Sequence, residues 1–277
     1  MKKQRIIFLK ILTFFILWIS VISIIFAIGD PTIIKGHQYL IRLWWELIPF
    51  LAVILLTIFF YKIVEENKLK KDIQGNVLKK EVFSIIVGIL WIGIPILLLH
   101  LTGNLQWGKI NYVPYLFVWV LSILINVIMQ EFLVRGYIFD LIKKEYNKVY
   151  AIIINTIIFT LFHGGAFEAG GIAILNVITM SIFVSLLLIY TKNLLGPIIV
   201  HSIWNIVGSL LGLITLADDY PILIDCVING NEIITGGIYK LEGSIIVLFI
   251  NLISIILMYL LINNRGKGLK INGNSIL

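Results

Sequence analysis

A succession of long apolar runs is the feature that most limits what this chain can fold into. Of its 277 residues, 60% are hydrophobic and only 13% are charged. A helix needs about 20 apolar residues to cross the hydrocarbon of a bilayer, and the apolar runs approach that length. Strands of a membrane barrel would instead be about 10 residues long with alternating polarity. The sequence therefore predicts an all-α, polytopic membrane helix bundle.

Eight runs are candidate transmembrane helices, and positive charge gives their orientation. The runs cover residues 6–28, 47–61, 82–101, 113–139, 149–163, 171–190, 194–216 and 244–262. With the N-terminus in the cytoplasm, sixteen Lys and Arg residues fall in cytoplasmic segments and four in outer segments. This is the positive-inside pattern. We expect a multi-pass protein of a bacterial plasma membrane with both termini in the cytoplasm.

The chain divides into three parts. Residues 1–112 hold three helices and a basic cytoplasmic loop at 62–81, and residues 113–216 hold the four central helices. Residues 217–277 hold an acidic, irregular outer segment, the last helix and a tail after Asn263 that is expected to lack structure. The net charge of +7 is explained by topology and contact with anionic lipid of the bilayer. We find no nucleic-acid-binding module, and no oligomeric state follows from the sequence.

Polar residues interrupt three of the central runs. An ionised side chain in hydrocarbon costs roughly 2.5–3.5 kcal/mol, so such residues mark candidate functional sites. Glu131 and Arg135 lie one turn apart on the same helix face. The candidate site residues are Gln130, Glu131, Arg135, His163, His201 and Asn205.

Depth in the membrane is a test of whether these residues can meet. Counted from the nearest cytoplasmic lysine at 1.5 Å per residue, Glu131 and His163 lie roughly 18 and 22 Å deep. His201 and Asn205 lie roughly 14 and 20 Å deep. An isolated Asn or His in such a helix is typically structural. The shared depth of the set on three helices favours a common site. Four other polar residues are interpreted as structural: His37, His100, Asn126 and Asn176.

Two imidazoles, a carboxylate and an amide form a set suited to peptide-bond hydrolysis. Imidazole and carboxylate can hold a water molecule and remove its proton, and an amide N–H can donate to an oxyanion. The side chains of His163, His201 and Glu131 could alternatively ligate zinc, although the two-histidine helix motif of soluble zinc proteases is absent. A proton relay in a small transporter is a third interpretation.

Three ordered motifs resemble those of the CAAX-type (CPBP, or Abi) intramembrane endopeptidases. They are Gln130-Glu131-x-x-x-Arg135, Phe159-x-x-x-His163 and His201-x-x-x-Asn205, and the resemblance covers residues 113–216. It implies about eight helices around a conical cavity and a membrane-associated peptide or protein as substrate. It also implies that the first glutamate of the acidic pair activates a water held by both histidines and the asparagine, with the arginine orienting the pair. A metal-free mechanism is favoured over zinc.

The sequence departs from the family pattern at Gln130, which stands where the first glutamate is expected. An amide cannot take up a proton as a carboxylate does. We therefore expect Glu131 to act as the base, His163 and His201 to position water, and Asn205 to bind the oxyanion. The alternative is a catalytically impaired member that binds a peptide or gives immunity to a bacteriocin.

Overall fold

The computed structural model describes residues 2–66 and 77–271, and within them the expected all-helical membrane bundle is confirmed. Among these described residues, six helical segments are long and apolar enough to cross a membrane: α1 (Lys2–Ile28), α2 (Gln38–Phe59), α3 (Val77–Leu101), α4 (Leu116–Arg135) with α5 (Tyr137–Glu145), α8 (Gly171–Thr191) and α11 (Ile245–Ile271). Two shorter apolar helices are α6 (Lys148–Leu161) and α9 (Leu195–Leu210). The short elements are η1 (Thr32–Ile34), η2 (Phe60–Val64), α7 (Gly164–Ala169), α10 (Glu232–Thr235) and η3 (Gly237–Gly243).

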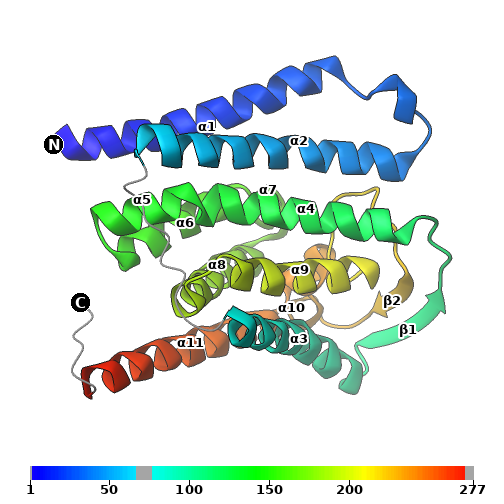
Figure 1. Ribbon diagram of the computed structural model, residues 1–277. Helices are drawn as coiled ribbons and strands as arrows, with labels where there is room; N and C mark the ends of the chain where they lie inside the picture. Colours follow the sequence, from blue (N-terminus) through cyan, green and yellow to red (C-terminus); the bar gives the residue numbers. More distant parts are fainter. Residues whose placement is uncertain (1, 67–76, 272–277) are drawn as a thin grey trace.

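The helices lie in roughly parallel rows (Figure 1). α2 packs on α4, α3 packs on α9, and α11 packs on α8. α8 is the most buried of the long helices and α1 the least, so α8 is central and α1 lies at the lipid-facing edge. α1 begins and α11 ends at the same end of the bundle, as an even number of crossings requires.

Gly136 divides the run that the sequence predicts as one helix over residues 113–139. α4 ends at Arg135 and α5 begins at Tyr137, with Gly136 between them. A Cβ atom at Gly136 would lie 2.4 Å from the Phe132 carbonyl oxygen, so only glycine fits this turn. The predicted run still forms one candidate membrane span, Leu116–Glu145, but with a break at Gly136.

The outer segments contain more structure than the sequence predicts. Strand β1 (Leu105–Ile110) pairs antiparallel with β2 (Ile224–Ile228), and the two lie at the end of the bundle opposite the start of α1 (Figure 1). Segment 217–243, expected to be irregular, thus contains β2, α10 and η3. The strand residues Ile224, Val227 and Ile228 are β-branched, which favours this pairing.

Two other boundaries differ from expectation. α11 continues to Ile271, so the tail is helical well past Asn263. α2 begins at Gln38, nine residues before the predicted run at 47–61. Part of the predicted basic loop at 62–81, residues 67–76, lies outside the described residues.

Candidate active site

A polar cavity of about 380 Å³ lies among the central helices. Four of the predicted site residues line it: Gln130 from α4, His163 after α6, and His201 and Asn205 from α9. Glu131 and Arg135 are not among its lining residues and are buried in the packed interior beside it. The structure thus divides the predicted set into residues that face the cavity and a pair that supports them.

Glu131 and Arg135 form a fully buried ion pair within α4. Arg135 Nη1 donates to both carboxylate oxygens of Glu131, at 2.7 and 2.9 Å. The remaining donors of Arg135 bond to α8, with Nε 3.1 Å from Ser185 Oγ and Nη2 3.1 Å from Ser181 Oγ. Ser181 and Ser185 are one turn apart and so present their hydroxyls on one face. These contacts offset the cost of burying two charges.

The Glu131 carboxylate also fixes the orientation of His201. His201 Nδ1 lies 2.8 Å from Glu131 Oε1, and because a carboxylate can only accept, Nδ1 carries the hydrogen. In the neutral ring Nε2 is then left with a free lone pair. His201 is buried in α9 and lines the cavity, so this lone pair is available there.

A different contact gives His163 the same tautomer, with the hydrogen on Nδ1 and the lone pair on Nε2. Its Nδ1 lies 2.7 Å from the Phe159 carbonyl oxygen, which again can only accept. α6 ends at Leu161, and His163 is the N-cap residue of α7. Because the last carbonyl groups of a helix have no partner within it, the Phe159 carbonyl oxygen can accept from a side chain. Both histidines therefore offer Nε2 as an acceptor in one cavity.

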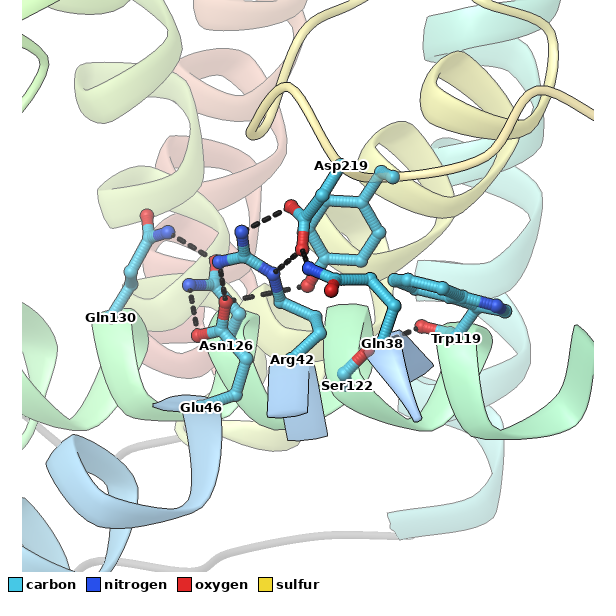
Figure 2. Close-up of polar contacts among 9 residues, drawn as sticks. Gln38, Arg42, Glu46, Trp119, Ser122, Asn126, Gln130 and Asp219 are labelled. Atoms are coloured by element: carbon cyan, nitrogen blue, oxygen red, sulfur yellow. Dashed lines mark hydrogen bonds and ion pairs between the residues drawn. The ribbon is translucent and has the colours of Figure 1, made fainter. Parts of the chain in front are cut away.

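A chain of side-chain amides fixes Gln130 (Figure 2). Gln130 Nε2 donates to Asn126 Oδ1 at 2.6 Å, and Asn126 Nδ2 donates to Glu46 Oε2 at 2.7 Å. The carboxylate at the end of the chain can only accept, which sets the direction of both bonds. Gln130 Oε1 is buried and has no hydrogen-bond partner among the described residues. Gln130 therefore presents an acceptor that cannot take up a proton.

Glu46 of α2 is a cavity-lining residue that sequence reasoning missed. It lies just before the predicted run at 47–61, and the sign that could have identified it is an acid within an apolar, aromatic stretch. Arg42 neutralises it at 3.3 Å and is itself paired with Asp219, in the loop after α9 (Figure 2). Burial raises the pKa of the Asp219 carboxyl, but hydrogen bonds from Arg42 and Gln38 lower it more, so the pKa lies below its usual range.

Glu242 of η3 is the second cavity-lining residue that was missed. The sequence places it in the acidic outer segment, where carboxylates are expected to be solvated. Instead, Trp204 Nε1 donates to its Oε1 at 3.1 Å. The sign that could have identified it is its position immediately before the apolar run at 244–262. Segment 217–243 thus folds back over the cavity, to which it also contributes Tyr220 and Tyr239.

An apolar groove of about 750 Å³ runs between α1 and α6. Its lining side chains are almost all hydrophobic, and they include Phe15 and Ile19 of α1 and Ile158 of α6. Phe162 lines both this groove and the polar cavity. Phe162 is therefore part of a wall shared by the groove and the polar cavity.

The predicted zinc ligands are not arranged as a zinc site. No group of three or more His, Cys, Asp or Glu side chains in residues 2–66 and 77–271 is arranged to hold a metal ion. Glu131, the predicted third ligand beside His163 and His201, has both carboxylate oxygens bonded to Arg135. A catalytic zinc site usually has three protein ligands. The donor set present does not fit the zinc alternative.

Comparison with protein families gives one match, over residues 111–207. The matching family is Rce1-like and is described as type II CAAX prenyl endopeptidase Rce1-like. The matched segment runs from just before α4 to within α9 and contains all three motifs. The match supports membership of the CPBP family that the motifs resemble. Neither the curated proteins nor the solved structures gave a match to the chain.

Proposed function

We propose that this Rce1-like chain is an intramembrane endopeptidase that hydrolyses a peptide bond of a membrane-associated peptide or protein. We place it in a bacterial plasma membrane with its N-terminus in the cytoplasm. One observation carries the proposal. Two histidines, each held with its Nδ1–H engaged, offer Nε2 in the same cavity as the Asn205 amide, inside the segment that matches a protease family.

The cavity groups suit the addition of water to a carbonyl carbon. A water molecule donates an O–H group to the Nε2 acceptor of a cavity histidine, which leaves its second O–H group for a proton acceptor and an oxygen lone pair for attack. The new C–O bond forms as the water loses a proton, and the Asn205 amide donates to the oxyanion. The C–N bond then breaks, and the leaving amine takes up the proton.

Glu131 acts through His201 in this proposal and not directly on water. Both of its oxygens contact Arg135, and its side chain has no exposed surface. A carboxylate behind an imidazole fixes the tautomer of the ring and stabilises the protonated form. The prediction that Glu131 is the direct base would require the ion pair with Arg135 to open. Arg135 keeps its predicted role of orienting the acidic side chain.

A metal chelator should leave cleavage unchanged. No group of three His, Cys, Asp or Glu side chains among the described residues is arranged to hold a metal ion, so we propose a reaction that proceeds without metal. The measurement is the cleavage rate in proteoliposomes with and without phenanthroline, together with the zinc content of the purified protein. One equivalent of zinc per chain and a rate that falls with chelator and returns with zinc would refute this proposal.

Incorporation of oxygen from heavy-oxygen water into a new peptide carboxylate is the direct test of hydrolysis. The probe is a set of synthetic single-span peptides in vesicles of phosphatidylglycerol and phosphatidylethanolamine, with products identified by mass spectrometry. We expect the wild-type chain to cleave and to label its product. The variant lacking both histidines, His163→Ala/His201→Ala, should not.

Gln130→Glu should raise the cleavage rate in the same assay. The change adds a carboxylate to the cavity wall. The gain should be smaller than the about 10²–10⁴-fold that a general base contributes, because the carboxylate cannot donate to Asn126 as Gln130 Nε2 does. An unchanged rate would show that position 130 does not face the reacting water.

A binding or immunity function is the second candidate, and the amide at Gln130 is the observation that favours it. In that case the wild-type chain would retain a peptide in the cavity without cutting it. Cleavage by Gln130→Glu together with none by the wild-type chain would support this alternative.

A further inference from the structure

The Glu242 carboxylate is in an unusual position for a cavity inside a membrane bundle. Its one side-chain hydrogen bond among the described residues comes from the neutral indole of Trp204. The cavity is lined by no Lys or Arg of the described residues, and Glu242 faces it together with His163, His201 and Asn205. Ionisable groups at such sites without a structural partner mark function.

The other two carboxylates near the cavity are already neutralised. Glu131 is paired with Arg135, and Glu46 is paired with Arg42 and further bonded to Asn126. Each has a cation beside it and its oxygens engaged in hydrogen bonds. Glu242 is thus the carboxylate of the described cavity wall that has an oxygen available for chemistry.

The backbone that carries Glu242 is held in place by α8. Asn176 Nδ2 donates to the carbonyl oxygens of Glu242 and Ser244, at 2.8 and 2.9 Å. The sequence interpretation of Asn176 as a contact between helices is therefore incomplete, because the side chain also clamps η3. A fixed backbone around a functional group keeps the geometry of a site in place before substrate binds.

Two glycines allow the tight turn that brings Glu242 into the cavity. Gly236 has a φ of +90°, and a Cβ atom there would lie 1.5 Å from the Lys240 carbonyl oxygen. A Cβ atom at Gly243 would lie 2.3 Å from the Gly236 carbonyl oxygen. Larger residues at either position would displace η3. The Glu242 side chain is thus presented by a segment that admits little change.

We propose that Glu242 is a catalytic residue that supplies the carboxylate missing at Gln130, an inference that rests on the proposed hydrolytic function. The water donates one O–H group to a histidine Nε2 and the other to the Glu242 carboxylate, which takes up that proton as the water oxygen bonds to the substrate carbonyl carbon. The protonated Glu242 then gives that proton to the leaving amine as the C–N bond breaks. The products are a carboxylic acid and an amine, and Glu242 returns to its ionised form.

The first test is Glu242→Gln, which keeps the size of the side chain and an oxygen that can accept from Trp204. We expect kcat to fall by about 10²-fold or more with little change in KM, because a general base acts on the transition state and not on binding. The acidic side of the rate–pH profile should lose the contribution of the Glu242 carboxylate and keep that of the two histidines, whose Nε2 atoms must stay unprotonated to accept. Glu232→Gln, an exposed glutamate in α10 of the same outer segment, is the matched control and should keep the wild-type rate.

The second test is rescue by Gln130→Glu in the Glu242→Gln background. A carboxylate at position 130 should restore cleavage, which a purely structural role of Glu242 would not allow. Undiminished cleavage by Glu242→Gln would overturn this inference and leave the proposed function standing. No cleavage by the wild-type chain, by Gln130→Glu or by the double variant would overturn both. Unfolding temperatures of all variants in detergent identify any loss that comes from misfolding.

Discussion

Replacement of His201 by alanine should reduce kcat by about 10²–10⁴-fold, the range by which positioned acid–base groups contribute to catalysis. The imidazole is one of the two Nε2 acceptors in the cavity, and it is the group through which the buried Glu131 acts. Arg135 still neutralises Glu131 in the variant, so the fold should be retained.

His100→Ala is the matched control for this change. His100 is exposed in α3, outside the cavity, and its ring contacts the Leu105 carbonyl oxygen at 3.4 Å and the Trp107 ring at a centroid distance of 6.1 Å. Loss of the His100 imidazole should leave the cleavage rate unchanged. The measurement is incorporation of heavy oxygen into product, with thermal unfolding in detergent to compare stability. A well-folded His201→Ala variant that cleaves at the wild-type rate would contradict the proposed arrangement.

Replacement of Arg135 by alanine should lower the free energy of unfolding by about 3–5 kcal/mol, because it leaves a buried carboxylate without its cation. Arg135 and Glu131 have no exposed side-chain surface, and four further contacts of the guanidinium to Glu131, Ser181 and Ser185 would be lost with it. Arg135→Lys keeps the charge but not the planar set of donors, so it should be destabilised by a smaller amount.

An exposed ion pair provides the comparison for this loss of stability. Lys3 forms an exposed pair with Glu145 at 3.0 Å, and Lys3→Ala should change stability by about 0–1 kcal/mol. The double variant Arg135→Ala/Glu131→Ala removes the uncompensated charge and should be more stable than Arg135→Ala. Denaturant titrations in micelles measure all three. Equal stability of the double variant and Arg135→Ala would show that lost packing, and not an unpaired charge, accounts for the effect.

The helices and four polar residues of the cavity could be predicted from sequence because both depend on local pattern. An apolar run specifies a membrane helix wherever it occurs. Polar residues inside such runs are few, and Gln130, His163, His201 and Asn205 were recognisable for that reason. Their spacing along each helix gave their depth, and the structure brings them to one cavity.

The parts that could not be predicted depend on contacts between distant segments. Glu46 joins the cavity through Asn126, which is 80 residues away in the chain. Glu242 is fixed by Trp204 and Asn176, 38 and 66 residues away. No periodicity encodes such contacts. The supporting position of Glu131 could not be predicted either. Neighbouring helix residues point about 100° apart, so only one of Gln130 and Glu131 can face the cavity. Which of the two does so depends on how α4 packs against the other helices.

The cavity wall that extends beyond residues 111–207 has a consequence for engineering. Trp18, Glu46, Tyr220 and Glu242 all lie outside the segment that matches the family, yet they complete the cavity. A fragment limited to the three motifs would have an incomplete cavity wall. Transplanting those motifs into another helical scaffold would transfer the histidines without the residues that close the cavity around them. A split version of the protein should therefore be cut in the β1–α4 connection and co-expressed as two halves. Neither half would have a complete cavity by itself.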